Sequence, residues 1–567
     1  MTTPPIRSSL DDTRRDKAFP QLDARQLSAL ESYGTRRRFA AGTVLFNEGD
    51  RHVGMFVVLS GSIDITRGQG CEDEHVVTHM PGMFSGEIGM LSGRGAVASA
   101  RAHEDSEVLV VDETALHRLI VSHAELSELI MRAYILRRVA LLETEKGATT
   151  LIGSRLSSET HHLRQFLARN AQPHTYLDID YDAETKEWMT HFHLSAEDLP
   201  VVFTPSGQQL RKPTNRELAD AIGLGPEPLE GRQFDLAVIG AGPAGLAAAV
   251  YAASEGLSVV VLDAKAPGGQ AGSSSKIENY FGFPTGISGQ ALTGRGFVQA
   301  QKFGAEVAIP RKVASFDCGA GKGTVAVIEG GERLTARAVV IATGAKYRGL
   351  DLPNLAAFEG RGIYYGAGFM EAQLCAQQEV IIVGGGNSAG QAAVFLAAHA
   401  SHVHILVRSN GLAASMSDYL IQRINATPNI TLHTRTEVVA LHGDTSLTGV
   451  DWRPADAPVQ LRPIEHVFLF CGAKPSTEWL SDCLTLDSAG FVKTGPDLTV
   501  AELTEAEWPL ARAPMRLETS HPGVFAVGDV RSGSVKRVAA AVGEGSTAVQ
   551  LVHLYLAEQR NEPTSQA

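Results

Sequence analysis

The sequence predicts a multidomain α/β protein, and three observations support this fold class. The chain has 567 residues, whereas one domain usually takes about 100–200. Two glycine-rich turns, at 240–245 and 384–389, each lie between an apolar strand-like run and a helix-like run. Two seams rich in Gly, Pro and small polar residues, at 143–154 and 222–233, interrupt the chain. We therefore expect three blocks, at 1–147, 150–224 and 232–560.

Composition narrows the class of protein. Hydrophobic residues make up 44% and charged residues 20% of the chain, and the formal net charge is −13. This charge argues against nucleic acid and anionic membranes as partners. The stretch "MTTPPIRSSLDDTRRDK" lacks an apolar core, so we expect no signal peptide, and no uninterrupted apolar run reaches about 18 residues, so we expect no membrane segment. No histidine pair has partners at the spacing of zinc ligands, and we predict no metal site.

The cysteines favour a reducing, cytoplasmic location. They are scattered, odd in number and nowhere spaced as C-x-x-C, a pattern that predicts unpaired thiols. They are Cys71, Cys318, Cys375, Cys471 and Cys483.

The first block is rich in short β-type runs such as "GTVLFNEGD" and "GMFVVLSGSIDITR", separated by turn residues and followed by a helix-like run. This order resembles the cyclic-nucleotide-binding β-roll, whose phosphate cassette is similar to "FSGEIGML" here. The resemblance implies that Gly86 offers a backbone amide to a bound nucleotide and that Glu87 holds its ribose hydroxyl.

The second half of that cassette departs from the family. Ala96 stands where the resemblance places the phosphate-binding arginine, and Arg94 comes two residues too early. A cyclic phosphate taken out of water needs a charged, bidentate donor. Two interpretations therefore stay open for this block: a cyclic-nucleotide site, or a ligand-free docking or dimerisation module.

The second block reads as strand, helix, strand, then "LPVVF", a hairpin and a helix. This order resembles a glutaredoxin or thioredoxin-like fold, and Pro200 stands where that family keeps a cis-proline. The family carries a cysteine nucleophile before its first helix, but here "GSRLSSETHH" offers only Ser157 and Ser158. The block contains no cysteine, so we predict a redox-silent domain in which one of these serines caps the helix.

The third block opens with the strongest motif of the chain, "FDLAVIGAGPAGLAAAVYAASEGLSVVVLDAK". An apolar strand leads into G-x-G-x-x-G, a helix of small residues follows, and a second strand ends in an acid. Such glycines permit a tight turn and a close approach to a pyrophosphate, and the acid accepts from a ribose hydroxyl. The predicted dinucleotide-binding residues are Gly240, Gly242, Pro243, Ala244, Gly245 and Asp263.

A second copy follows in "EVIIVGGGNSAGQAAVFLAAHASHVHILVRS", where the same roles fall to Gly384, Gly386, Asn387, Ser388 and Ala389. The strand after it ends in Arg408 rather than in an acid. Because a guanidinium pairs with a 2′-phosphate, Arg408 favours NADPH, with NADH as the alternative donor. The other interpretation of Arg408 is an exposed charge at the end of a strand.

At this point the third block resembles the low-molecular-weight thioredoxin reductases over its full length. The segments "APGGQAGSSSKIENYFGFP", "VVIATGA", "VFLFCGAKPSTEWL" and "GVFAVGDVRSGSVKRVAAAVGEG" are similar to that family's motifs in the same order. The resemblance implies an FAD domain at 232–350 and 472–560, an NAD(P) domain at 351–471, and a homodimer. It places these further residues at the flavin: Gln270, Asn279, Asp529, Lys536, Arg537 and Val538.

One departure from that family concerns the chemistry. Where it reads C-A-T-C-D, this chain reads "GAGFM", so that Gly366 and Phe369 replace the two cysteines. We expect Cys375 to be a buried structural thiol, and Glu371 is a weak candidate for the lost acid. Hydride transfer from NAD(P)H to flavin needs positioning rather than a thiol. The electrons must then pass to a protein disulfide, a quinone, an iron–sulfur carrier or dioxygen.

The predicted architecture is therefore a β-roll, a thioredoxin-like α/β domain and two Rossmann-like dinucleotide-binding domains. The predicted activity is that of an FAD-containing, NAD(P)H-dependent oxidoreductase whose acceptor and catalytic residues are not identified. The alternative is a non-enzymatic sensor, in which bound flavin and nucleotide report redox state through the β-roll.

Overall fold

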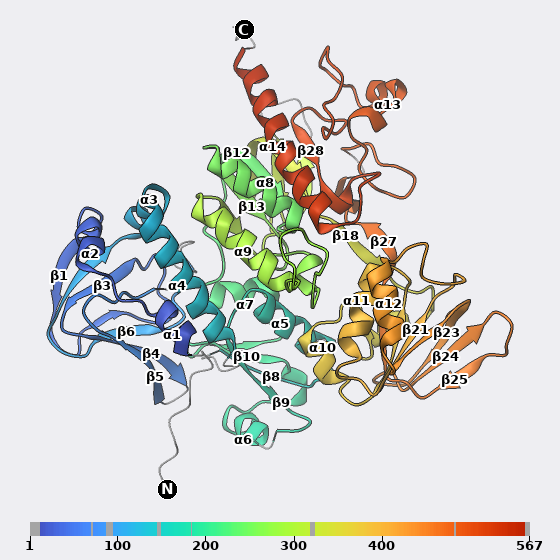
Figure 1. Cartoon of the computed structure of the whole chain (residues 1–567), viewed down its shortest axis with the longest axis horizontal. Coiled ribbons are helices and arrows are strands. Elements are labelled where there is room, and N and C mark those ends of the chain that lie inside the picture. The colour runs from blue at the N-terminus through green and yellow to red at the C-terminus, as the bar shows by residue number, and fades with distance from the viewer. Residues whose placement is uncertain are drawn as a thin grey trace. The chain divides into compact units, whose positions relative to one another are not determined.

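The computed structural model describes residues 12–69, 72–86, 94–143, 149–182, 184–317, 324–480 and 483–561. The chain divides into two compact units (Figure 1). Unit 1 comprises Met1–Arg155, His162–Pro228 and Val298–Arg311, and unit 2 comprises Leu156–His161, Leu229–Phe297 and Lys312–Ala567.

The N-terminal block is a β-roll with helices on either side in sequence. Its strands form two antiparallel sheets, of order β1-β7-β3 and β2-β6-β4-β5. β3 is buried along most of its length and shares an apolar core with Leu116 and Tyr134. The predicted β-roll is therefore confirmed. Its elements are α1 (Asp12–Ala18), α2 (Ala24–Leu30), β1 (Thr35–Phe39), β2 (Val44–Phe46), β3 (Met55–Ser60), β4 (Ile63–Gln69), β5 (Glu72–His79), β6 (Ser99–Ala102), β7 (Ser106–Val111), α3 (Glu113–Ser122) and α4 (Ala124–Glu143).

The second block contains a mixed sheet of order β11-β10-β8-β9, in which β8 runs parallel to β9 and antiparallel to β10. The Leu199–Pro200 peptide is cis, as predicted. The Ser157 hydroxyl accepts a hydrogen bond from the Thr160 N–H at 3.3 Å, which confirms the predicted cap. The elements are β8 (Thr149–Gly153), α5 (Ser158–Arg169), β9 (His174–Asp178), α6 (Glu184–His191), β10 (Val201–Phe203), β11 (Gln209–Arg211) and α7 (Asn215–Ala221).

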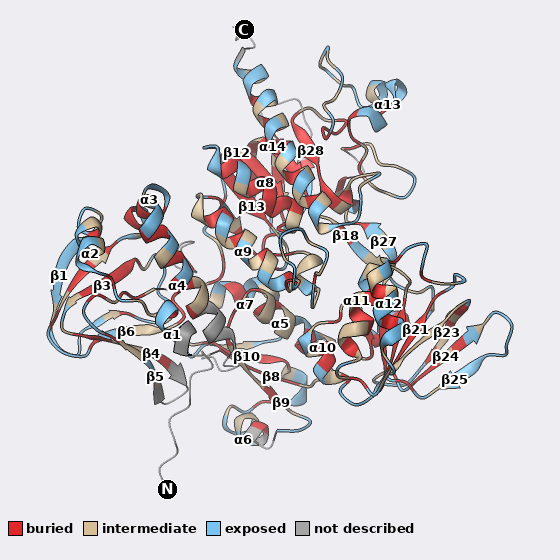
Figure 2. Ribbon diagram, viewed as in Figure 1, coloured by how far each residue is buried: buried red, intermediate tan, exposed pale blue. Residues whose placement is uncertain are grey.

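The sheet that carries the first glycine motif has the order β14-β13-β12-β17-β16-β15, with β28 beside β17. Buried residues gather on β12, β13 and β28 (Figure 2). α8 and α14 lie side by side (Figure 1). Gly545 permits this close packing, because a Cβ at that position would clash with the Ala244 carbonyl. The elements are β12 (Gln233–Ile239), α8 (Pro243–Ser254), β13 (Val259–Leu262), α9 (Gly289–Lys302), β14 (Glu306–Ala308), β15 (Val313–Asp317), β16 (Thr324–Ile328), β17 (Arg333–Ile341), β28 (Val524–Ala526) and α14 (Val538–Asn561).

The second glycine motif lies in a parallel sheet of order β19-β26-β20-β21-β22. Two further sheets accompany it, β23-β24-β25 and the antiparallel pair β18-β27. The elements are β18 (Ala345–Arg348), β19 (Ile363–Tyr364), α10 (Phe369–Leu374), β20 (Glu379–Val383), α11 (Asn387–Leu396), β21 (His402–Leu406), α12 (Asp418–Ala426), β22 (Ile430–His433), β23 (Thr436–His442), β24 (Gly449–Pro454), β25 (Gln460–Arg462), β26 (His466–Leu469) and β27 (Cys471–Pro475).

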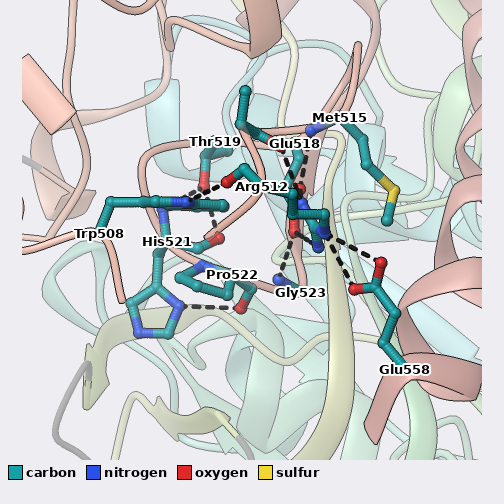
Figure 3. A network of polar contacts seen from close by, with 10 residues as sticks. Trp508, Arg512, Met515, Glu518, Thr519, His521, Pro522, Gly523 and Glu558 are labelled. Carbon is teal, nitrogen blue, oxygen red and sulfur yellow. Dashed lines mark hydrogen bonds and ion pairs between the residues drawn. The ribbon is translucent and has the colours of Figure 1, made fainter. Parts of the chain in front are cut away.

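A buried ion-pair network holds the C-terminal part of unit 2 together (Figure 3), beyond the short helix α13 (Val500–Glu505). Glu518 is 0% exposed, and its carboxylate accepts from Arg512 at 2.6 Å, from the Met515 N–H at 2.8 Å and from the Gly523 N–H at 3.0 Å. Arg512 also pairs with Glu558 on α14 at 2.9 Å. The network therefore ties this loop to the last helix.

The cysteines require a correction. Cys375 is a buried free thiol, as predicted, and Cys471 is also free. Cys483, however, is disulfide-bonded, so the prediction of unpaired thiols throughout was wrong. Its sulfur lies 3.7 Å from the Phe316 carbonyl oxygen. Cysteines far apart in sequence give no spacing signal for such a bond; Cys71 and Cys318 lie outside the described residues.

None of the helices within the described ranges has the length and hydropathy that a membrane-spanning helix requires.

Candidate functional site

The first glycine turn follows directly from β12, and its geometry requires glycine. Gly240 has φ +112°, in the left-handed region, and a Cβ there would clash with the Ala342 carbonyl. A Cβ at Gly245 would clash with the Gly240 carbonyl. Helix α8 can therefore start immediately after the strand, as the motif predicts.

The start of α8 is open on the side where a phosphate would bind. Gly242 is its N-cap, Pro243 begins the helix and Ala244 is buried. The nearest atom to a Cβ built on Gly242 is the Gly269 Cα, at 3.9 Å. The first N–H groups of a helix lack partners within the helix and carry a partial positive charge. This end of α8 therefore fits a pyrophosphate.

The two acids of the predicted flavin site have different surroundings. The Asp263 carboxylate already accepts from three backbone groups, the Ala241 N–H at 2.9 Å, the Lys265 N–H at 2.8 Å and the Ala266 N–H at 3.1 Å. It therefore shapes the glycine turn, a role that the motif alone does not reveal.

Asp529 is a candidate ligand of a different kind. Its side chain is half-buried, and desolvation raises its pKa from the ordinary value. Within the described residues, its carboxylate accepts no hydrogen bond, whereas its backbone carbonyl accepts from Lys536 Nζ at 2.8 Å. A half-buried carboxylate that accepts no hydrogen bond from the protein can accept from a hydroxyl-bearing ligand, and the ribityl chain of FAD is such a group.

The other predicted flavin residues lie on loops and on one helix end. Gln270 and Asn279 are exposed and flank the short helix 271–273 and the residues after it. Lys536, Arg537 and Val538 stand at the start of α14. Gln270, Asn279, Lys536 and Arg537 are exposed and Val538 is partly exposed, so all five are accessible to a ligand.

The second glycine turn repeats the design of the first. Gly384 has φ +139°, and a Cβ there would lie 2.6 Å from the Phe470 carbonyl oxygen. Gly386 is the N-cap of α11 with nothing within 4 Å of its Cβ position. Ala389 is fully buried, and the Asn387 side chain accepts from the Ser417 N–H at 2.7 Å. This helix end is therefore as open to a phosphate as that of α8.

Two residues near this turn bear on the nucleotide. Arg408 is exposed just beyond β21 and forms no ion pair within the described ranges. Ser388 hydrogen-bonds to Tyr347, whose pKa is raised by burial. Tyr347 lines a cavity of about 370 Å³ on β18 and β27, together with the cations Lys346, Arg348 and Lys474. Tyr347 carries no sequence signal and was missed.

The segment at the family's dithiol position lies beside the predicted flavin loop. A Cβ on Gly366 would be 3.8 Å from the Ser273 side chain. Phe369 begins α10 and is 60% exposed. Cys375, at the end of α10, is fully buried, and burial raises the pKa of its thiol to about 11. A thiol with such a pKa stays protonated near neutral pH and is a poor nucleophile.

Glu371 is buried and engaged. Its carboxylate accepts from the Gly368 N–H at 2.8 Å, and its other oxygen lies 3.6 Å from the buried His161 Nε2. The His161 ring is also 6.0 Å from that of Tyr364. His161 lies in the first turn of α5, far from Glu371 in the sequence, and no sequence motif predicts its contact with Glu371.

The structure describes only some of the residues predicted to bind a nucleotide in the β-roll. Gly86 has φ +118°, its Cβ position would be filled by the Tyr134 ring, and its carbonyl accepts from Arg137 at 2.8 Å. Ala96 is buried. Glu87 lies outside the described residues. Among the residues that the structure describes, no group of His, Cys, Asp and Glu is placed to hold a metal ion.

Comparison with known proteins identifies two families. A model described as pyridine nucleotide-disulphide oxidoreductase matches residues 234–545. A cyclic nucleotide-binding domain model matches residues 36–123. The first match covers more than half of the chain.

The similar curated proteins are thioredoxin reductases. NADPH-dependent thioredoxin reductase 3 of Arabidopsis thaliana is 32% identical over 369 residues, which are 61% of this chain and 65% of that protein. The match thus spans slightly less than two thirds of the plant protein. Thioredoxin reductase of Bacillus subtilis (strain 168) is 31% identical over 333 residues, which are 58% of this chain and 96% of that protein.

Solved structures agree with these relatives. Lactococcus lactis thioredoxin reductase in its FR conformation has a TM-score of 0.51 at 27% identity, covering 57% of this chain and 99% of that one. Thioredoxin reductase from T. acidophilum has a TM-score of 0.51 at 29% identity, covering 58% and 99%. The chain therefore belongs to the pyridine nucleotide-disulphide oxidoreductase family and is an oxidoreductase of the thioredoxin reductase type with an N-terminal cyclic nucleotide-binding domain.

Proposed function

We propose that this protein is an FAD-containing oxidoreductase that takes hydride from NADPH and passes the electrons to an acceptor without an internal dithiol. The observation that carries the proposal is the pair of glycine turns in unit 2, each opening a helix whose N-terminus is free to hold a phosphate. Relatives named thioredoxin reductases share this part of the chain.

FAD is the cofactor that the first turn would hold. The start of α8 fits its pyrophosphate, and the half-buried Asp529 carboxylate would accept from its ribityl hydroxyls. Gln270, Asn279 and the residues 536–538 would complete the site. When bound, the flavin would supply two-electron chemistry between a nicotinamide and an acceptor.

NADPH is the proposed donor. The start of α11 would hold its pyrophosphate, and the exposed Arg408 would pair with its 2′-phosphate. Lys346 and Arg348 at the cavity on β18 and β27 add positive charge suited to an anionic nucleotide, whereas Lys474 there pairs with Glu478 at 2.6 Å.

The absence of a C-x-x-C dithiol at the family's position limits the second half of the reaction. The sequence contains no C-x-x-C, and Gly366 and Phe369 would occupy the positions of the family's cysteines. The acceptor would therefore be reduced directly from the flavin. A protein disulfide, a quinone, an iron–sulfur carrier and dioxygen all remain candidates. We further propose a cytoplasmic homodimer, since closed twofold assemblies are the commonest; a mass of 60.4 kDa in light scattering would contradict it.

Anaerobic stopped-flow mixing of the purified yellow protein with NADPH tests the proposal. Rapid loss of the flavin absorbance, followed by its return when an acceptor is added, is the expected result. Binding of NADPH without bleaching would instead support a sensor. A protein that stays colourless after incubation with FAD would contradict the flavin site itself.

A further inference from the structure

The cassette end of the β-roll contacts the segment that leads toward the flavin-binding block. The Gly95 N–H donates to the Gly223 carbonyl oxygen at 3.0 Å. Gly95 precedes Ala96, which stands where the phosphate-binding arginine is expected, and Gly223 follows α7. We call residues 223–227 the linker; all of them belong to unit 1.

The close approach at this contact depends on glycines. Gly223 has φ +70°, in the left-handed region. A Cβ there would lie 3.2 Å from the Gly95 Cα and 3.5 Å from the Gly49 carbonyl oxygen. A Cβ on Gly95 would lie 3.0 Å from that same oxygen. Three backbones thus meet at a distance that side chains would prevent.

Two side chains of the turn before β3 hold the rest of the linker. Arg51 Nη2 donates to the Gly225 carbonyl oxygen at 2.7 Å. The His52 ring lies between two carboxylates, with Nε2 2.9 Å from Glu227 Oε1 and Nδ1 2.8 Å from Glu113 Oε2. The β-roll therefore contacts the linker both at its backbone, through Gly225, and at one acidic side chain, Glu227.

The backbone and the side chain of Ala96 both make contacts inside the β-roll. The Ala96 N–H donates to the Asp50 carbonyl at 2.9 Å, and its carbonyl accepts from the Gly49 N–H at 2.7 Å. Its methyl group belongs to an apolar core with Phe46 and Phe56. A cyclic phosphate cannot enter this core without a compensating charge.

Two other arginines of the β-roll are buried, Arg67 and Arg94, and neither stands at position 96. Arg67, on β4, is buried, and the carboxylates of Glu48 and Glu74 oppose the fall in its pKa that burial causes. Arg67 therefore has internal counter-charges within the β-roll.

From these contacts we propose that the β-roll of this protein is a docking module for its own linker, residues 223–227, and not a receptor for cyclic nucleotides. The segment that would bind a nucleotide phosphate instead presents Gly95 to the linker. The turn 49–52 supplies the remaining contacts.

The linker continues into the strand that ends in the first glycine turn. Within unit 2, the Leu229 N–H donates to Glu332, and the Glu230 carboxylate accepts from the Arg333 N–H at 2.6 Å. β12 starts at Gln233 and ends just before Gly240. Holding the linker therefore restrains the chain directly upstream of the predicted flavin site.

Hydrogen exchange of the full-length protein, followed by mass spectrometry of peptides covering 222–228, tests the proposal. Arg51→Ala should speed exchange in these peptides by about tenfold, since a hydrogen bond from a charged group contributes roughly 1.5–3 kcal/mol. Arg51→Lys should restore part of the protection. The matched control is Arg37→Ala on β1, an exposed arginine without linker contact, which should leave exchange unchanged.

Cyclic AMP and cyclic GMP, added at 1 mM in the same experiment, should neither bind in calorimetry nor alter exchange of the linker. Unchanged exchange in Arg51→Ala would show that the β-roll does not hold the linker. Calorimetric binding of either nucleotide would show that the cassette is still a receptor, and its loss in Arg67→Ala would identify the arginine responsible. Either result overturns the proposal.

Discussion

Arg408 is exposed just beyond β21. In an NAD-binding protein an acidic residue would stand at this position. Arg408→Ala should weaken NADPH binding about ten- to a hundredfold while leaving NADH binding nearly unchanged, because only NADPH carries a phosphate to pair with the guanidinium. Titration of each nucleotide by fluorescence measures both constants.

Arg453→Ala is the matched control for this change. Arg453 is exposed on β24 in the same domain and pairs with Glu437. Its removal should affect neither nucleotide. An equal loss for both nucleotides in Arg408→Ala would mean that the arginine only supports the loop.

His466 gives a prediction about pH. It is 9% exposed, stacks on Tyr364 with ring centres 5.9 Å apart, and burial lowers its pKa to about 4. The unfolded chain would bind a proton near the ordinary value of 6.5, whereas the folded chain stays neutral. Its contribution to stability is therefore complete above pH 6.5 and is lost as the pH falls toward 4.

Replacing His466 tests whether its protonation lowers stability as the pH falls. His466→Phe should flatten the fall of the melting temperature between pH 6.5 and 4, since it removes the titrating ring from a site that stacks on Tyr364. Thermal unfolding across this range provides the measurement. If the variant and the parent lose stability in parallel, other groups dominate the acid response.

Residues differ in how far the sequence predicts them. Gly240, Gly384 and the serine cap at Ser157 were predictable, because a positive φ or a helix start constrains the local residue type. His161 was not, since its contact with Glu371 joins positions far apart in the chain and leaves no periodic pattern.

At the scale of elements, the loop before β28 depends on one buried acid. Glu518 is fully buried and accepts from Arg512 and from two backbone N–H groups (Figure 3). Glu518→Ala should destabilise unit 2 by about 3 kcal/mol, because two backbone N–H groups lose their acceptor at roughly 1–3 kcal/mol each, whereas Arg512 keeps its pair with Glu558. Chemical denaturation measures this loss.

Glu505→Ala is the comparison for Glu518→Ala. Glu505 is the last residue of the nearby helix α13 and is exposed. The substitution Glu505→Ala should change the free energy of unfolding by less than about 0.5 kcal/mol. A similar small effect in Glu518→Ala would mean that the loop adapts without the network.

Element prediction succeeded where a pattern repeats. The β-roll strands, the two glycine-turn helices and the order of the thioredoxin-like block were all readable from alternation and turn residues. α6 was missed, because it is short and its apolar residues are Trp188 and Met189, which pack on a small core. The disulfide of Cys483 also escaped, since a long-range bond has no spacing signature.

For the whole molecule, seams and motifs predict three blocks, whereas the structure groups the chain into two units. The sequence does not predict the contacts that join the first two blocks. The bond between Gly95 and Gly223 requires two glycines from distant segments to meet, and neither segment predicts the other. The seam at 222–233 is predicted to separate two blocks, and the structure holds it at several points. Gly and Pro mark a break in secondary structure; whether the break is mobile depends on its partners.

The number of electrons that the protein accepts tests the mechanism as a whole. The position beside the flavin loop holds Gly366 and Phe369, and Cys375 is buried with a pKa of about 11. We therefore expect anaerobic titration with NADPH to end at two electrons per chain, all in the flavin. Cys375→Ser should leave both the titration and the turnover with any acceptor nearly unchanged.

The disulfide of Cys483 makes this titration decisive. Its sulfur lies near the Phe316 carbonyl, on β15, rather than beside Gly366. If the titration instead ends at four electrons, Cys483→Ser shows where the extra pair goes: a return to two electrons would identify this disulfide as a second redox centre. In that case a dithiol at a different place would have taken over the role of the family's C-x-x-C, and direct reduction of the acceptor by the flavin would be wrong. A value of two electrons in both proteins leaves the flavin as the sole electron store and makes the disulfide structural.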